Sequence, residues 1–217
     1  MCQHIIQDMS ERTHDRRTIV KNLGVVGAAG VLSATTAIAA SRRKVEFGAK
    51  YAGNKIDFEA WFTSTDVEGE NAIARNNEIG TKSKNEDSYG YISVSTSSEN
   101  SCQYSIPSDS FIHLIRVNSG ELEFETGDVP DSDTESDVEI GSMSGDRTRY
   151  HVSVAGDISP RDNVENTFLI GQDGIVTDVN GNRRMNGNVT DGEDTYDISG
   201  QFVQMNLEPD IQLERYA

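Results

Sequence analysis

Hydrophobic and polar residues alternate along most of the chain that follows residue 40. In Ile56–Phe62 every second residue is apolar, and Tyr91–Ser95 alternates in the same way. A period of two is the signature of a half-buried strand. Further strands are expected at residues 150–154, 167–170, 195–199, 202–205 and 211–216. The pattern predicts an all-β fold, an antiparallel β-sandwich that follows an N-terminal signal-peptide helix.

Turn residues separate these strands. Phe111–Val117 is apolar on both faces and predicts a central strand, and Asn118-Ser119-Gly120 then leads into Glu121–Thr126. We expect these two strands to form a hairpin. Further turns are expected at Asn180-Gly181, Asn186-Gly187 and Asp191-Gly192, because Asn, Asp and Gly adopt the backbone conformations that turns require.

The domain organisation follows from a break in the pattern. A β lobe is expected over residues 45–126, an acidic linker or loop over 127–145, and a second β lobe over 146–217, with one continuous sandwich as the alternative. The acidic stretch should lie outside on a loop, because buried unpaired carboxylates are costly. The residues expected to face the core are Phe58, Phe62, Ile92, Val94, Leu114, Val152, Val154, Ile198 and Leu213.

Two similar four-residue segments, which we call the echo, are relevant to whether the two lobes have the same architecture. Glu86-Asp87-Ser88-Tyr89 precedes one expected strand, and Glu193-Asp194-Thr195-Tyr196 opens another. Two lobes of similar architecture would produce such an echo. Chance, or a turn type that both segments share, explains four similar residues equally well.

The first 39 residues form a separate segment. Arg16 and Arg17 are followed by Lys21, then by a Gly- and Ala-rich apolar run, and the segment ends at Ala37-Ile38-Ala39. This resembles a twin-arginine signal peptide with a small-x-small cleavage site, preceded by an N-terminal extension if Met9 is the true start. The resemblance implies export in the folded state, a secreted or cell-surface location, and no stable membrane anchor after cleavage. An uncleaved anchor helix is the alternative.

The net charge of the chain bears on its partners and on the solvent in which it works. The 217 residues include 19 Lys plus Arg and 36 Asp plus Glu, a net charge of −17, and Lys is scarce after the leader. A surface this acidic disfavours nucleic acid as a partner. An acidic, Lys-poor composition resembles that of haloarchaeal proteins, whose carboxylates stay hydrated in concentrated salt. Molar salt shortens the Debye length to about 3 Å, so the carboxylates scarcely repel one another there.

A second resemblance concerns the C-terminal third. Tyr150–Ile158, Met185–Val189 and the strand that begins at Asp194 resemble a β module found at the C-terminus of haloarchaeal exported proteins, over residues 138–216. Ile198 stands where that pattern prefers an aromatic residue. The module implies a β fold and carries no catalytic residues.

Few residues suggest catalysis. Gly141–Gly145 has the glycines of a nucleophile elbow, but Met143 occupies the nucleophile position. His113 and His151 are the only histidines after the leader. We expect an ordinary hydrogen bond for each, and no Ser, Cys or carboxylate that converges on either at hydrogen-bond distance in an open cleft. Cys102 is the only cysteine after the leader, and we expect it to be buried. No catalytic or cofactor-binding residue is assigned.

Three ligand sites remain open. Asp131, Asp133, Glu135 and Asp137 alternate like the start of a calcium loop, but the glycine and glutamate that such a loop requires are missing. A solvated acidic loop is therefore favoured over calcium binding. Asn188 begins a glycosylation sequon and is expected at a turn. The aromatic residues that could stack on sugars are Trp61, Tyr89, Tyr91 and Tyr104. Packing in the core or on the sheet surface is favoured over sugar stacking for them.

These observations favour an exported, non-catalytic β-sandwich that serves as an extracellular or cell-surface binding or assembly module in a halophile. Its expected partner is a polysaccharide or another surface protein. One alternative is a secreted polysaccharide hydrolase that uses two of the many carboxylates. The other is a filament subunit that assembles through exposed edge strands.

Overall fold

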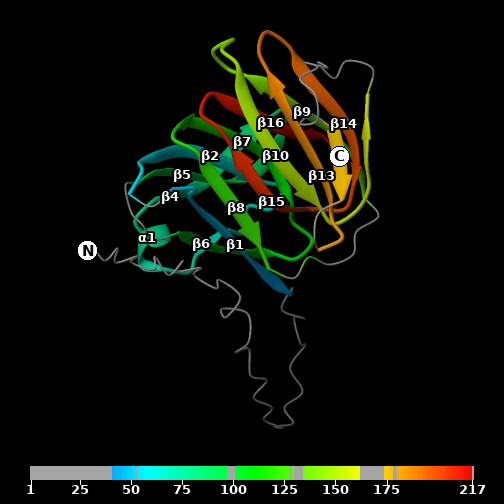
Figure 1. Cartoon of the computed structure of the whole chain (residues 1–217). Coiled ribbons are helices and arrows are strands. Elements are labelled where there is room, and N and C mark those ends of the chain that lie inside the picture. Colours follow the sequence, from blue (N-terminus) through cyan, green and yellow to red (C-terminus); the bar gives the residue numbers. More distant parts are fainter. Residues whose placement is uncertain are drawn as a thin grey trace, which may run out of the picture. The chain divides into compact units, whose positions relative to one another are not determined.

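The computed structural model describes residues 41–216, apart from 52, 97–100, 128, 130–133, 162–173 and 178–179. Within these residues two eight-stranded antiparallel sheets pack as a sandwich (Figure 1), so the all-β antiparallel prediction is confirmed. The described residues form one compact unit. The leader residues Arg16, Arg17, Lys21, Ala37 and Ala39, and the strand expected at 167–170, lie outside the described residues.

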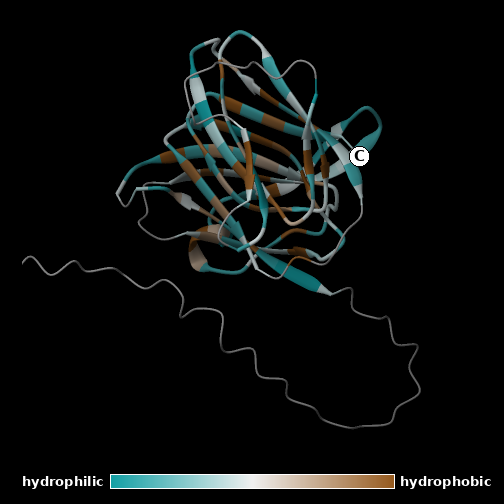
Figure 2. Cartoon of the chain, turned by 45° about the vertical axis from the view of Figure 1, so that its right-hand side comes forward, coloured by the Kyte–Doolittle hydropathy of each residue, from teal (hydrophilic) through white to brown (hydrophobic). Residues whose placement is uncertain are grey.

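The elements follow in this order: β1 (Arg42–Ala49), β2 (Ile56–Phe62), β3 (Glu68–Gly69), α1 (Ala72–Arg75), β4 (Glu78–Lys84), β5 (Asp87–Thr96), β6 (Cys102–Pro107), β7 (Ile112–Ser119), β8 (Leu122–Thr126), β9 (Glu135–Ser142), β10 (Thr148–Val154), β11 (Ile158–Pro160), β12 (Gly174–Thr177), β13 (Arg183–Val189), β14 (Glu193–Ser199), β15 (Phe202–Leu207) and β16 (Ile211–Tyr216). Alternation is visible along the strands, where apolar segments interrupt polar ones (Figure 2). The single-turn helix α1 is capped at its N-terminus by Asn71, whose side chain accepts a hydrogen bond from the Ala74 N–H.

Strand order differs from a simple meander. Sheet A runs β12-β13-β10-β15-β8-β1-β6-β3, and sheet B runs β11-β14-β9-β16-β7-β2-β5-β4. Apart from β4·β5 and β12·β13, successive strands lie in opposite sheets. The hairpin expected between Phe111–Val117 and Glu121–Thr126 is therefore wrong, because β7 belongs to sheet B and β8 to sheet A. Gly120, with φ of 76°, lies in the connection between the sheets.

The sandwich is an internal repeat. In each half the first strand pairs with the eighth, the second with the seventh, the third with the sixth and the fourth with the fifth: β1·β8, β2·β7, β3·β6 and β4·β5 correspond to β9·β16, β10·β15, β11·β14 and β12·β13. The halves join through β7·β16 and β8·β15. In each of these pairs the seventh strand of one half lies beside the eighth strand of the other. The two halves thus share one plan, with sheets A and B interchanged.

Details of register and sequence agree with this repeat. Both β2 and β10 shift register before their last residue, at Phe62 and Val154, against the seventh strand of their own half. Val45–Gly48 in β1 matches Val138–Gly141 in β9 as Val-Glu-x-Gly. The echo between residues 86–89 and 193–196 is not part of the repeat, because it falls on β5 and β14, the fifth and sixth strands of their halves.

The core of the first half is aromatic. The ring of Phe47 in β1 lies 5.1 Å from that of Phe58 and 5.0 Å from that of Phe124, and it meets the ring of Tyr104 edge-on at 6.1 Å. All four side chains are fully buried. Tyr104, expected as a candidate for sugar stacking, is therefore a core residue that no ligand can reach.

The core of the second half contains a buried polar cluster. The Tyr150 hydroxyl donates to Asp194 at 2.5 Å and lies 2.6 Å from the Tyr196 hydroxyl. Burial raises the pKa of Tyr150, and the neighbouring Tyr196 and Asp194 raise it further. Tyr150 lies in sheet A, whereas Asp194 and Tyr196 lie in sheet B, so the cluster links the two layers.

Gly187 makes room for this cluster. A Cβ atom at position 187 would lie 2.2 Å from the Tyr150 hydroxyl oxygen. The turn expected at Asn186-Gly187 is wrong, because both residues lie inside β13. Glycine is required there by the close Tyr150 side chain on the neighbouring strand β10, and not by turn geometry. The turn at Asn180-Gly181 is present, with Gly181 at φ of 88°.

The acidic stretch was also expected to be a loop, and part of it is a strand. Residues 135–142 form β9, which pairs with β14 on one side and β16 on the other. Ser136, Val138 and Ile140 are buried, so the intervening carboxylates point outward. The loop prediction is wrong for this segment because its buried face is short and begins with a serine, so that the acidic side chains dominate the pattern.

Candidate functional site

The outer face of sheet B carries a row of aromatic side chains, which we call the aromatic row: Trp61, Tyr89, Tyr91, His113 and Tyr216. The Trp61 ring lies 5.9 Å from Tyr89 and 6.3 Å from Tyr91. Tyr89 stacks on His113 at 4.3 Å, and His113 meets Tyr216 edge-on at 6.3 Å. Four strands, β2, β5, β7 and β16, contribute to this surface.

Strand alternation places these side chains outside. Phe58, Ala60 and Phe62 of β2 are fully buried between the sheets, so Trp61 projects to the other face. Trp61 pairs in register with Tyr91 on β5 and with Leu114 on β7. Leu114 is buried as expected, but it is not part of the core cluster. The register shift beside Phe62 puts Leu114 opposite Trp61, on the face of the aromatic row.

A charged cluster lies within the row. Glu214 is only 4% exposed and contacts the Lys84 ammonium group, and the His113 Nε2 atom lies 3.4 Å from its carboxylate. His113 Nδ1 is 2.7 Å from the Arg215 carbonyl oxygen. Desolvation lowers the pKa of His113, although the Arg215 carbonyl and Glu214 act in the opposite direction.

The contact between His113 and Glu214 is buried, and His113 Nε2 makes no hydrogen bond, so it is not a convergence of a histidine and a carboxylate in an open cleft. These two side chains come from β7 and β16, which lie far apart in the sequence and pair only in the folded sheet. The second ring nitrogen of His113 bonds to a backbone carbonyl and not to a hydroxyl or thiol. The pair thus lacks the nucleophile that a catalytic triad requires.

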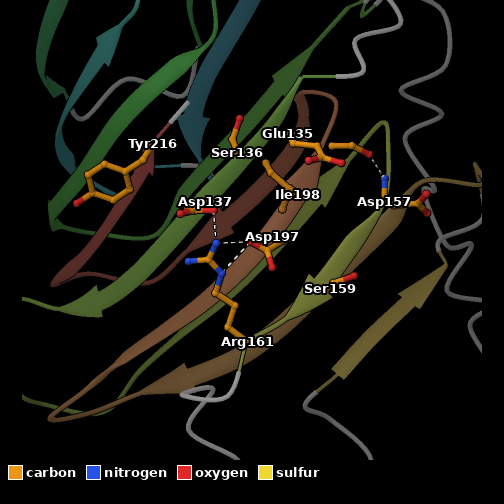
Figure 3. Close-up of a pocket in the computed structure, with 10 residues that line it drawn as sticks. Glu135, Ser136, Asp137, Asp157, Ser159, Arg161, Asp197, Ile198 and Tyr216 are labelled. Carbon is orange, nitrogen blue, oxygen red and sulfur yellow. Dashed lines mark hydrogen bonds and ion pairs between the residues drawn. The ribbon is translucent and has the colours of Figure 1, made fainter.

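Beside the row is an open hollow of about 610 Å³ (Figure 3). Its charged lining residues are Glu135, Asp137, Asp157, Arg161 and Asp197. The Arg161 guanidinium group lies between two carboxylates, 2.5 Å from Asp137 and 2.6 Å from Asp197 (Figure 3). The hydrogen bond from Arg161 is the main cause that lowers the pKa of Asp197.

Tyr216 connects the aromatic row to the hollow. It is 40% exposed and lines the hollow. Its hydroxyl donates to Glu139 at 3.1 Å, and its register partner on β9 is Asp137. Burial raises the pKa of Tyr216, and Glu214 and Glu139 add to this effect. Tyr91 and His113 are buried, so Trp61, Tyr89 and Tyr216 form the accessible part of the aromatic row, and Tyr216 joins it to the carboxylates of the hollow.

The internal repeat provides a comparison for this surface. Trp61 corresponds to Ser153, Tyr91 to Arg184 and Leu114 to Gln204, because each set holds the same register in its own half. The same strands therefore pair without aromatic or aliphatic side chains at these outer positions. The aromatic row is not a requirement of the fold.

The calcium hypothesis rests on residues that the structure separates or does not describe. Asp131 and Asp133 lie outside the described residues, whereas Glu135 and Asp137 are strand residues of β9 that line the hollow. No group of three or more potential metal ligands occurs in the part of the chain that the structure describes. Calcium binding stays a prediction.

The other candidates lie apart from this surface. His151 is exposed, and its Nδ1 atom is 2.6 Å from the Asn186 side-chain oxygen. Cys102 is buried as expected, and burial raises the pKa of its thiol. Asn188 is 9% exposed inside β13, so its expected turn location is wrong.

Sequence reasoning found Trp61, Tyr89 and Tyr91 but missed Glu214, Tyr216 and Arg161. The alternation of Ile211–Tyr216 already placed Glu214 and Tyr216 on one face, which is the signal that could have identified them. Arg161 follows the short strand β11 and carries no signal of this kind.

Comparisons with protein-family models, curated proteins and solved structures give no significant match. Among the described residues no helix has the length and apolar character needed to cross a membrane.

Proposed function

We propose that this protein is an exported, non-catalytic binding module that holds a polysaccharide on the outer face of sheet B. The observation that carries the proposal is the aromatic row, because the positions equivalent to Trp61 and Tyr91 in the other half bear Ser153 and Arg184. Sugar rings present apolar faces that stack on aromatic side chains, and their hydroxyls bond to neighbouring polar groups. The row and the hollow supply both kinds of contact along one surface.

The net negative charge of the hollow limits the class of polysaccharide that can bind there. Glu135, Asp137, Asp157 and Asp197 outnumber the single cation Arg161 among its charged lining residues. A polymer rich in carboxylates would be repelled there. Neutral or amino-bearing sugars are therefore the expected ligands.

Export is the second part of the proposal. It is supported by Arg16-Arg17, the apolar run and Ala37-Ile38-Ala39, and by the acidic composition. A secreted or cell-surface location in a salt-rich medium would give a polysaccharide-binding face access to its ligand.

The test is affinity measurement on a panel of neutral, amino-bearing and uronate-bearing soluble polysaccharides. Trp61→Ala and Tyr216→Ala should each weaken binding about tenfold, which corresponds to roughly 1.4 kcal/mol. Gln204→Ala, at the position equivalent to Leu114, is the matched control and should bind like the wild type. Equal binding by all variants, or no binding to any polymer of the panel, would contradict the proposal.

A hydrolase is the second candidate, and one observation favours it. Glu139 and Glu214 are register partners on β9 and β16, so their Cβ atoms are about 4.5–5.5 Å apart. Two carboxylates near a sugar-binding surface are the minimum for glycoside hydrolysis. Release of reducing ends from the same panel, abolished in Glu139→Gln, would establish this activity and exclude a purely binding role.

A further inference from the structure

The four sheet edges differ greatly in their capacity to pair with another chain. In sheet A the outer strands are β3, with two residues, and β12, with four. In sheet B they are β11, with three residues including Pro160, and β4, with seven. Short strands and proline protect an edge from pairing. β4 is therefore the one long edge in the described part of the sandwich.

β4 is long for an edge strand. Its equivalent in the second half is β12, the fourth strand there, for which the structure describes the four residues Gly174–Thr177. β4 pairs with β5 from Glu78↔Ser93 to Lys84↔Asp87. Most of its side chains are exposed, including Ile79 at 36%. A long edge with an exposed aliphatic side chain is a template for strand addition.

Hairpin geometry determines which backbone groups of β4 are free. Asn85 and Glu86, with φ of 52° and 75°, form a two-residue turn closed by Lys84 and Asp87. The residues that close such a turn form a hydrogen-bonded pair, and the pattern alternates from there. The N–H and C=O groups of Ile79, Thr81 and Ser83 therefore point away from β5, toward the open edge.

The charges of β4 complement a second copy of the same strand. Antiparallel self-pairing with full overlap centres on Thr81, and it places Glu78 of each copy opposite Lys84 of the other. Ile79 then faces Ser83, and Gly80 faces Lys82. Edge lysines normally oppose pairing, but here Lys84 meets a carboxylate and Lys82 meets a glycine. Directly opposed unlike charges favour a strand pair.

We propose that two copies of this protein associate through β4·β4 pairing to form a symmetric dimer. The interface is isologous, since the same seven residues serve both subunits, and it leaves no free long edge in the described part of either subunit. Lys82 is the register partner of Tyr89, so the dimer brings the two aromatic rows to either side of one junction. A polymer could then engage both faces, with the gain in avidity that linked sites give.

The test is the molar mass in solution, measured by light scattering and sedimentation without any ligand, in salt that preserves the native strand spectrum. The wild type should have twice the monomer mass. Thr81→Pro should be a monomer with an unchanged circular dichroism spectrum, because it removes an edge N–H and no bond to β5. Thr81→Val keeps that N–H and should remain a dimer.

A charge exchange tests the register. Glu78→Lys alone should associate at least about tenfold more weakly than the wild type, since it places a second positive charge opposite Lys84 of the other copy. Glu78→Gln, which removes the negative charge without adding a positive one, should weaken association less than Glu78→Lys does. A monomeric wild type, or a Thr81→Pro variant that still dimerises, would overturn the proposal. Both measurements are independent of polysaccharide binding, so they cannot fail because the proposed function fails.

Discussion

Trp61 and Ser153 occupy equivalent positions in the two halves of the sandwich. Each is the last residue before the register shift in its strand, and each pairs with the fifth and seventh strands of its half. Only Trp61 has aromatic neighbours, Tyr89 and Tyr91. Because the fold tolerates serine at this position, the aromatic row is a specialisation of one outer face.

The same comparison explains the cores. Phe58 and Val94 are register partners in the first half, and Tyr150 and Gly187 are the equivalent partners in the second. The added hydroxyl of Tyr150 bonds to Asp194, and glycine replaces the bulkier residue beside it. The larger side chain on one strand is thus matched by a smaller one on its partner strand, and the backbone arrangement stays the same in both halves.

Gly187→Ala should destabilise the protein. The new Cβ would lie 2.2 Å from the Tyr150 hydroxyl oxygen, so the ring must move and strain the bonds to Asp194 and Tyr196. We expect a loss of about 1–3 kcal/mol in the free energy of unfolding, as for other overpacked cores. Denaturant unfolding in a fixed salt concentration measures it. Gly80→Ala, with no atom within 4 Å of the new Cβ, is the control, and equal stability of both variants would contradict the prediction.

The strands that sequence reasoning identified well are those with regular alternation. Ile56–Phe62 and Ile211–Tyr216 were predicted with the bounds that β2 and β16 have. These segments carry their own signal because one face is buried along their whole length. In contrast, β13 contains Asn186-Gly187, where the glycine leaves room for the Tyr150 side chain of another strand. Local turn chemistry therefore predicted a turn at a position that lies inside a strand.

Pairing was less predictable than strand location. The segment Asn118-Ser119-Gly120 has the composition of a hairpin turn, but it connects sheet B to sheet A. Both neighbouring strands have a buried face, and that pattern is the same whether they pair or face each other across the core. The cluster of His113, Glu214 and Lys84 was missed for the same reason, since it depends on which strands become neighbours.

Removal of the leader is a prediction that the described residues do not address. Mass spectrometry of the exported protein should find an N-terminus at or near Ala40, because Ala37-Ile38-Ala39 has the form of a cleavage site. Replacing Arg16 and Arg17 together with Lys should abolish export. Protein recovered from the medium with an intact leader would be inconsistent with this expectation.

Folding should depend on salt. A chain with 36 acidic and 19 basic residues repels itself in dilute buffer, and molar salt screens this repulsion beyond about 3 Å. The circular dichroism spectrum should be rich in strand in molar salt and should partly lose that signal at low salt. A thermal transition that has the same midpoint in both conditions would remove the argument for a halophilic protein.

Two buried arginines lead to the last prediction. Arg43 is 6% exposed and Arg215 is fully buried. Arg43 donates to Thr126 and to the Ser110 carbonyl, and Arg215 donates to Ser136. Burial lowers the pKa of both to about 10, and Arg43 also lowers that of Arg215. Two like charges therefore share a region of low polarity without a carboxylate partner among the described residues.

Arg43→Met should therefore stabilise the protein, by about 1–4 kcal/mol at neutral pH, because an apolar side chain carries no desolvation cost. The folded-state pKa of about 10 lies below the ordinary value of an arginine side chain, so above pH 10 the folded chain releases the proton before the unfolded chain does. The cost of the buried charge is complete below pH 10 and fades as the pH rises toward 12.5. The stability difference between variant and wild type should accordingly be largest at neutral pH and smaller at pH values above about 10. Arg149→Met, at an exposed position of β10, is the control and should change stability little. An Arg43→Met variant that is less stable than the wild type would contradict the prediction, because it would show that the hydrogen bonds to Thr126 and Ser110 outweigh the cost of burial.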